Sequence, residues 1–329
     1  MRPGVRFGSV PPEGTGGEGW RVLAIFLQTL PFFALIGLGW LAGKLRFFPA
    51  EATRWLTHFV FWFALSAMLF RFAATLDLPA LFDARFVAAY VAGSGALWAL
   101  GFALSRRTGQ PLADAAMQAH VGMTGNTGFL GVPMLVALLG ERAIGPVLMV
   151  LTIDMIVFST LITLIIAAAR HGRIGPGALT AALKGVVTNP MIVSMAAGLT
   201  WAALRLPLPA PALDFLTLLG AAATPGALFA IGASLTTRPV GRVGPAVWLS
   251  AAKLILHPAA VAVAAWAFGV PPGPAGVMIA AAALPVAGNV YMLAHHFRVA
   301  EQRVSAAILI STAVSILTVP AVIHAITKG

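Results

Sequence analysis

The sequence predicts an all-α membrane protein with ten transmembrane helices, arranged as two inverted five-helix repeats. Three observations support this fold class. First, 59% of the 329 residues are hydrophobic and only 9% are charged, whereas about a quarter of a soluble domain is charged. Second, apolar runs of about 20 residues, the length that spans a bilayer, recur along the chain. Third, two of these runs, five apart in order, share an unusual polar interruption.

The apolar runs define the expected elements in chain order. They cover residues 22–43, 54–73, 86–104, 113–139, 145–169, 185–204, 213–235, 244–268, 272–297 and 303–326. Residues 1–19 are rich in Gly and Pro without apolar periodicity, which predicts a disordered N-terminal tail. Residues 20–169 would form the first repeat and 185–327 the second, with 170–184 as a cytoplasmic linker.

The distribution of basic residues predicts the orientation. If the helices alternate in direction, the loops on one side hold twelve Lys and Arg residues and the internal loops on the other side hold four, namely Arg71, Arg85, Arg142 and Arg205. The twelve are Lys44, Arg46, Arg54, Arg106, Arg107, Arg170, Arg173, Lys184, Arg238, Arg242, Arg298 and Arg303. Because cytoplasmic loops carry the excess of positive charge, both termini are expected outside the cytoplasm.

Composition and motifs argue against several other classes. The chain has no cysteine, which excludes disulfides and thiol nucleophiles. Its basic residues are dispersed between apolar runs, so no nucleic-acid partner is expected. The Ser250–Lys253 stretch spells S-x-x-K but lies inside an apolar run without its partner motifs. No H-E-x-x-H or P-loop motif is present. We therefore expect neither an enzyme nor a bound metal or cofactor.

The fourth and ninth runs are each interrupted by a Gly-Asn pair near a proline. The fourth contains Gly125, Asn126, Thr127 and Pro133, and the ninth contains Pro285, Gly288 and Asn289. Glycine and proline weaken helices, and unwound backbone inside a membrane is tolerated only beside protein or a polar cavity. Interruptions at matching places in two inverted halves indicate a binding site, whose free amides suit an anion. The alternative is that these glycines only permit close helix packing, the interpretation favoured for Gly39 and Gly43.

Ionisable and hydroxyl side chains inside the runs supply further candidates. Asp154 lies within the fifth run, where a charge costs about 2.5–3.5 kcal/mol on insertion scales, so it is a candidate proton acceptor or substrate contact together with Ser159. Lys253 and His257 share one face of the eighth run and could balance Asp154 or attract the anion. Ser311 and Thr312 could bind substrate. The alternatives are a neutral hydrogen-bonded aspartate, a snorkelling lysine and hydroxyls that join helices.

Several stretches together resemble the auxin efflux carrier family, whose bacterial members are described as malate or malonate permeases. They are Gly125–Pro133, Asn189-Pro190, Thr224–Leu235, Lys253–Pro258, Leu284–Ala294, and Ser311-Thr312 followed by Ser315, Thr318 and Pro320. The resemblance covers residues from about 20 to 327, and its strength lies in the order of six motifs rather than in any one of them.

The resemblance implies that helices 4 and 9 cross at their breaks and hold a substrate carboxylate there. Asn126 matches the family's crossover asparagine and Pro285 its second proline, whereas Gly125 replaces a proline of plant members and predicts a less sharp break. Helices 1, 2, 6 and 7 would form a scaffold that dimerises, and helices 3–5 and 8–10 would move. Only residues 170–184 join the halves, so the long loop of many plant members is missing and a bacterial metabolite is the expected substrate.

The resulting hypothesis is an elevator-type secondary transporter of a small carboxylate in the plasma (inner) membrane, coupled to protons or driven by membrane potential. The closest alternative is a sodium-coupled organic anion symporter of the bile-acid-transporter type. Such carriers place acidic residues near the crossover, where this chain offers only Asp114 at one end of the fourth run. A receptor-like or structural membrane protein is a third alternative.

Overall fold

The computed structural model describes residues 18–76, 83–171, 176–236 and 243–328. Within these ranges the chain is helical, with no strand beyond one isolated antiparallel bridge between Gly125 and Val286. Most of the expected disordered tail, residues 1–17, lies outside the described part, and its last two residues, Glu18 and Gly19, already belong to the first helix.

The first half of the chain forms the following elements in order. They are α1 (Glu18–Lys44), α2 (Ala50–Phe59), η1 (Val60–Ala64), α3 (Leu65–Ala74), α5 (Ala84–Arg107), α6 (Leu112–Met123), η2 (Thr127–Gly131), α7 (Val132–Leu139), η3 (Glu141–Ala143), α8 (Ile144–Ile153), η4 (Asp154–Phe158) and α9 (Ser159–His171). Here η1, η2 and η4 are single π-helical turns, which insert one extra residue into an α-helix and are frequent at functional sites.

The second half begins within the expected linker. Its elements are α10 (Pro176–Val187), α11 (Pro190–Ala203), α12 (Ala210–Ala221), α13 (Ala223–Leu235), α14 (Val243–Ala251), the π turn η5 (Ala252–Leu256), α15 (His257–Ala267), α16 (Pro272–Ala282), α17 (Gly288–Phe297) and α18 (Glu301–Lys328). Much of the segment expected to be a loop is therefore helical. Asn189 separates α10 from α11, because its side chain accepts the amide of Met191 (2.9 Å) and caps a helix that Pro190 opens.

Seven helical stretches of the described chain are long and apolar enough to cross a membrane. They are Leu23–Lys44, Ala50–Ala74, Ala84–Arg107, Glu141–Ala169, Ala210–Leu235, Gly244–Ala267 and Glu301–Thr327. The other three expected spans contain shorter apolar helices, Thr127–Leu139, Pro190–Ala203 and Pro272–Ala282. The prediction of an all-helical, multi-pass membrane protein is thus confirmed.

Two helix pairs from opposite halves of the sequence pack closely. Helix α1 packs on α13, and α3 packs on α11. In the first pair, a Cβ atom added to Gly39 would overlap the carbonyl oxygen of Phe229, and one added to Gly232 would overlap that of Ile36. Gly198 of α11 lies in the same way against the backbone of Phe70 in α3. Gly39 and its neighbour Gly43 therefore serve close packing, as small residues do in membranes.

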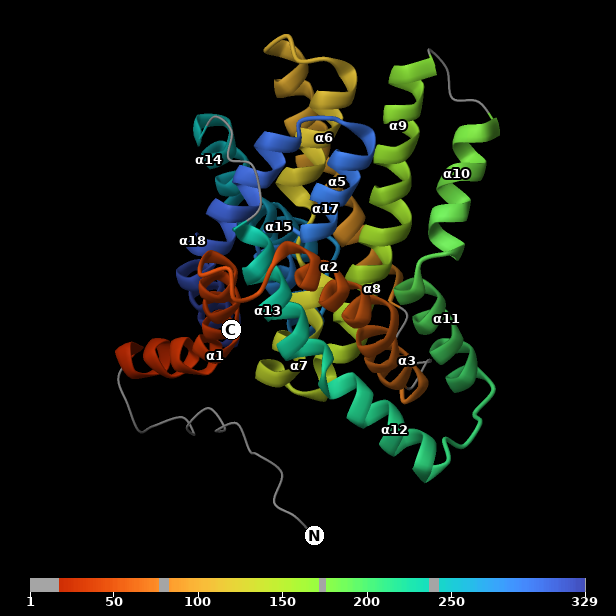
Figure 1. Cartoon of the computed structure of the whole chain (residues 1–329). Helices are drawn as coiled ribbons and strands as arrows, with labels where there is room; N and C mark the ends of the chain where they lie inside the picture. The colour runs from red at the N-terminus through yellow and green to blue at the C-terminus, as the bar shows by residue number, and fades with distance from the viewer. Residues whose placement is uncertain (1–17, 77–82, 172–175, 237–242, 329) are drawn as a thin grey trace.

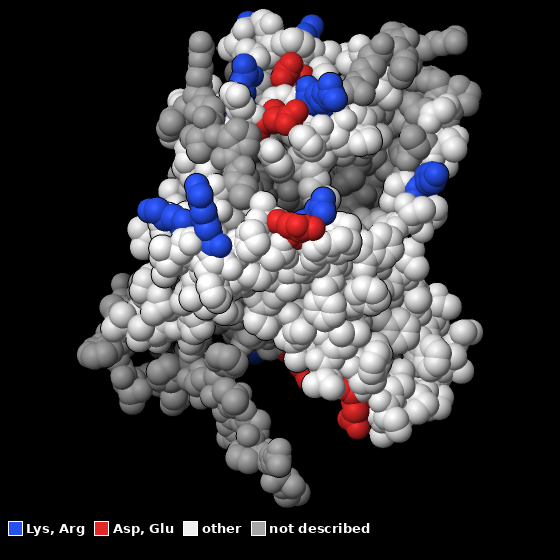
Figure 2. Space-filling view, in the orientation of Figure 1, with Lys and Arg blue, Asp and Glu red and all other residues white. Residues whose placement is uncertain are grey.

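The remaining helices surround the interrupted segments. Helix α5 packs on α6 and α15, and α18 packs on α14 (Figure 1). Helix α18 also packs on α16. In Figure 2, Lys and Arg side chains on the visible face lie mainly in the upper half, and the lower half is mostly uncharged. Several buried polar side chains, among them Thr124, Asn126 and Thr127, lie where α6 ends.

Candidate functional site at the crossing of two broken helices

The fourth and ninth segments are both interrupted, and the two interruptions pair with each other. Helix α6 ends at Met123 and α16 ends at Ala282. Between the breaks the amide of Asn126 donates to the carbonyl of Pro285 (2.8 Å), and the amide of Ala287 donates to the carbonyl of Thr124 (3.2 Å). These bonds form the isolated antiparallel bridge and satisfy unwound backbone that lipid could not.

Local chemistry explains why the chain unwinds here. Pro285 has no amide to donate, and the following amide, that of Val286, donates to the Ser311 hydroxyl of α18 (3.1 Å). Gly125 is required by close approach, because a Cβ atom there would lie 3.1 Å from both the Ala281 carbonyl oxygen and the Lys253 Nζ atom. Glycine at this position therefore breaks the helix and also leaves room for a lysine.

Two half-helices begin at the crossing. The π turn η2, which continues into α7, starts at Thr127, and α17 starts at Gly288. The first amides of each have no intrahelical acceptor, and each start carries partial positive charge. The hydroxyl of Thr127, a side chain only 1% exposed, has no hydrogen-bond partner among the described residues. The crossing thus offers several unused donors to an anion.

Lys253 brings a side-chain amine, which is an ammonium when protonated, to the same point. It is completely buried in the π turn η5. Its Nζ atom donates to the carbonyl oxygen of Ala282, at the C-terminal end of α16, and lies 3.1 Å from Nδ1 of His257. When Lys253 is protonated it can only donate, so Nδ1 of His257 then accepts and Nε2–H points at the Ser94 hydroxyl (2.9 Å). Lys253 is therefore an interior group rather than a snorkelling one.

Asp154 is the second buried ionisable group of the site. It is 4% exposed and opens the π turn η4. The Tyr90 hydroxyl donates to its Oδ1 atom (2.9 Å), and Oδ2 is buried without a partner among the described residues. Asp154 and Lys253 interact electrostatically but form no direct ion pair, since the described residues contain only one pair within 4.0 Å, His295–Glu301.

Comparison with known proteins bears on what this site does. A model of the family described as "Membrane transport protein" matches residues 24–174 and 178–323. The chain belongs to the auxin efflux carrier family of membrane transport proteins. It is also 33% identical over 308 residues, 91% of this chain and 95% of the relative, to a protein of Rhizobium meliloti (strain 1021) named "Putative malonate transporter".

The two Gly-Asn pairs of this auxin efflux carrier family member are not equivalent in the structure. The bridge aligns Gly125 with Val286, so Asn126 is one residue past it and Asn289 is three residues past. Asn126 is only 5% exposed, whereas Asn289 is exposed. The sequence motif matches, but the register is offset by two residues, because Gly125 lies in the bridge itself and Gly288 begins a helix.

The structure also places the other predicted site residues, Pro133, Thr312, Ser159 and Ser311. Pro133 is buried in the first turn of α7, and Thr312, 5% exposed, lies beside Ser311 on α18. The Ser159 hydroxyl instead donates to the carbonyl of Asp154 (3.0 Å), five residues earlier, across the π turn. The Ser159 hydroxyl is thus bonded within its own helix, and the Ser311 hydroxyl accepts a backbone amide of the interruption in the ninth segment.

Tyr90 and Ser94 are functional candidates that sequence reasoning missed. Both are buried on α5, one turn apart, and they contact Asp154 and His257 respectively. The available signal was weak: Tyr90 is one of only two tyrosines and lies within an apolar run. A tyrosine and a serine spaced by four residues share one helix face.

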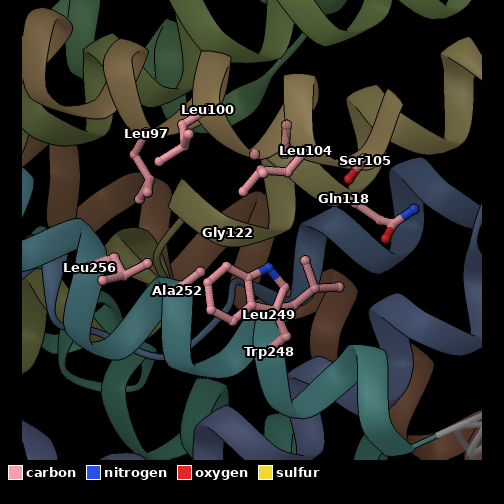
Figure 3. Close-up of a pocket in the computed structure, with 12 residues that line it drawn as sticks. Leu97, Leu100, Leu104, Ser105, Gln118, Gly122, Trp248, Leu249, Ala252 and Leu256 are labelled. Atoms are coloured by element: carbon pink, nitrogen blue, oxygen red, sulfur yellow. The ribbon is translucent and has the colours of Figure 1, made fainter. Parts of the chain in front are cut away.

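A groove on the outer surface lies beside the segments that lead into the crossing. Figure 3 shows it between α5, α6 and the α14–η5 segment, with the Trp248 indole near its centre and Gln118 toward one end. Gly122 and Ala252 line it, and a Cβ atom added to Gly122 would lie 3.7 Å from Cβ of Ala252. Five of the twelve lining residues are leucines, and Trp248 and Leu100 are exposed. The groove faces outward and is not part of the anion site.

Proposed function

We propose that this protein is a secondary active transporter of a small organic anion, with the substrate carboxylate bound where the two breaks cross. The paired breaks carry this proposal, because they bring two half-helix starts and the Lys253 ammonium to one buried point. Half-helix N-termini at the bilayer midplane are a recurring way to bind anionic substrates.

The substrate proposal starts from the relative's name. A malonate transporter carries a three-carbon dicarboxylate, so malonate and its close analogues are the first compounds to test. We assign the contacts to the amides after Gly125 and Gly288, the side chains of Asn126 and Thr127, and Lys253. Asn289 is the weaker of the two asparagines in this assignment because it is exposed.

The packing supports ten spans in two inverted repeats. If the first helix corresponds to the sixth and the second to the seventh, then the pairs α1–α13 and α3–α11 are equivalent contacts. The crossing of the fourth and ninth segments then lies on the symmetry axis, where Gly125 meets Val286. These relations are those expected of a twofold axis in the membrane plane.

An elevator-type movement fits the same division. Helices 1, 2, 6 and 7 pack among themselves through α1–α13, α3–α11 and α2–α13, and helices 3–5 and 8–10 enclose the crossing. We propose that the first group is a scaffold that dimerises and that the second carries the substrate. The basic upper half of the face in Figure 2 supports an inner-membrane orientation with both termini outside the cytoplasm.

A sodium-coupled mechanism is less well supported. The Lys253 ammonium already contacts the carbonyl end of α16, where a coupling cation would otherwise neutralise the helix terminus. The described residues contain no group of three His, Asp or Glu side chains arranged around a common point. We therefore expect substrate uptake without a sodium gradient.

Reconstitution into proteoliposomes tests the proposal. Radiolabelled malonate should accumulate inside the proteoliposomes at equal rates with and without a sodium gradient. A panel of unlabelled mono- and dicarboxylates, added as competitors, then shows which of them the carrier also accepts. Asn126→Ala should reduce uptake more than Asn289→Ala, and both variants should be checked for expression and size-exclusion profile. Failure of every tested carboxylate to enter or exchange would refute the proposed function.

A further inference from the structure

A chain of buried polar side chains joins the two charged groups of the site. From Asp154, the contacts run to the Tyr90 hydroxyl (2.9 Å) and then to Ser94, which interacts with Tyr90 one turn along α5. Ser94 lies 2.9 Å from Nε2 of His257, and Nδ1 of His257 lies 3.1 Å from the Lys253 Nζ atom. All five side chains are at most 4% exposed.

We propose that Tyr90 and Ser94, with His257, form a proton relay between Asp154 and Lys253. This inference rests on the proposed function and adds a mechanism of proton coupling to it. The relay lets the two groups exchange between a state in which both are charged and a state in which both are neutral, while both stay buried. Tyr90 and Ser94 act through the charged groups and do not themselves touch the crossing.

The proton balance of one transfer is simple. Lys253 gives one proton to Nδ1 of His257, and Nε2 of His257 gives its proton to the Ser94 oxygen. Ser94 passes its hydroxyl proton to the Tyr90 oxygen, and Tyr90 passes its own to the Asp154 carboxylate. The products are a neutral amine, the other tautomer of a neutral histidine, intact hydroxyls and a protonated aspartic acid.

This exchange links substrate binding to proton uptake. Two buried charges without a direct contact are costly, so the empty carrier favours the neutral pair. A bound anion requires the lysine ammonium, and the relay supplies its proton from Asp154. The aspartate then takes one proton from water on the side of entry. Each substrate molecule is therefore accompanied by one proton, which returns when the substrate leaves.

The helices packed on α5 bring only two other titratable side chains toward the relay. The elements packed on α5 are α6, α8, α15 and α16, and beyond the relay they contribute only Asp114 and His120, both on α6. His120 is buried and lies 3.3 Å from the Thr124 hydroxyl beside the fourth break. Asp114 is in the first turn of α6, and Arg85, Arg106 and Arg107 are at the ends of α5.

The test separates net transport from exchange. Proteoliposomes containing a trapped pH-sensitive dye are given malonate, and net uptake and internal acidification are followed together. Counterflow of labelled against unlabelled malonate is measured in parallel, because a loaded carrier that crosses in both directions needs no change of protonation. Tyr90→Phe and Ser94→Ala should each lower net uptake and acidification by at least about tenfold, with counterflow within about twofold of the unmodified protein.

Ser305→Ala is the matched control. Ser305 is also fully buried, but its hydroxyl has no partner among the described residues, so both rates should be unchanged. The relay is refuted if both variants keep normal net uptake and acidification, or if they lose counterflow and net uptake in equal measure. Absence of counterflow in the unmodified protein with every tested carboxylate would instead refute the proposed function.

Discussion

Replacement of Lys253 is the most direct test of the electrostatics of the site. Lys253→Met keeps an unbranched apolar side chain but removes the ammonium that contacts the Ala282 carbonyl and His257. A hydrogen bond to a charged group contributes about 1.5–3 kcal/mol. Because 1.4 kcal/mol corresponds to a factor of ten, the Km for malonate should rise about 10- to 100-fold.

The same substitution should also lower stability, and a second variant separates the two effects. Two buried acceptors left without a donor cost about 1–3 kcal/mol each. Lys253→Gln retains N–H donors without the charge, so it should be more stable than Lys253→Met while sharing its higher Km. Uptake kinetics in proteoliposomes and thermal unfolding in detergent measure both quantities.

Lys184→Met is the control, because Lys184 is exposed at the end of α10 and should alter neither quantity. If both Lys253 variants fold and keep a Km within about twofold of the unmodified protein, the ammonium does not hold the substrate. The assignment of the anion site to the crossing would then be wrong.

Three further substitutions test the crossing and the helix packing. Gly125→Ala places a Cβ atom 3.1 Å from two polar atoms, so uptake should fall and the free energy of unfolding should drop by about 1–3 kcal/mol. Gly39→Ala overlaps a backbone carbonyl, so the yield of folded protein in size-exclusion chromatography should fall below that of Gly125→Ala. Gly37→Ala meets open space and should change neither uptake nor the yield of folded protein. Ser311→Ala removes the acceptor of a buried amide and should lower the free energy of unfolding by about 1–3 kcal/mol, more than Ser305→Ala does in the same thermal assay.

Composition and breaker residues were enough to predict the membrane class and the positions of both interruptions. Seven of the apolar runs match long helical stretches and the other three contain shorter helices, because lipid imposes a length and a composition that the sequence must display. Gly125 and Pro285 indicated where the chain unwinds, since glycine is too flexible to favour a helix and proline lacks the backbone amide that a helix bonds. The pairing of the breaks follows from the same need, as unwound backbone in a membrane requires partners.

Details that depend on register were beyond the sequence. The offset between Asn126 and Asn289 is set by the backbone groups that bond across the bridge. The two Gly-Asn pairs look equivalent in the sequence, so the sequence alone does not predict it. The Ser159 hydroxyl donates to the Asp154 carbonyl across the π turn at Asp154–Phe158, a contact within the helix that the sequence did not indicate. A period of 3.6 residues cannot reveal such a turn. Tyr90 was missed because its importance comes from a partner on another helix.

The bridge between the two breaks has a consequence for biosynthesis. When Thr124, Gly125 and Asn126 enter the bilayer, the residues that will bond to them have not yet been translated, since Pro285 and Ala287 come half a chain later. Until then an open break would leave an amide and a carbonyl without partners in hydrocarbon, at several kcal/mol each. The fourth segment must therefore enter as a temporarily continuous helix or wait in a hydrated part of the insertion machinery. Its final shape is reached only after the ninth segment arrives.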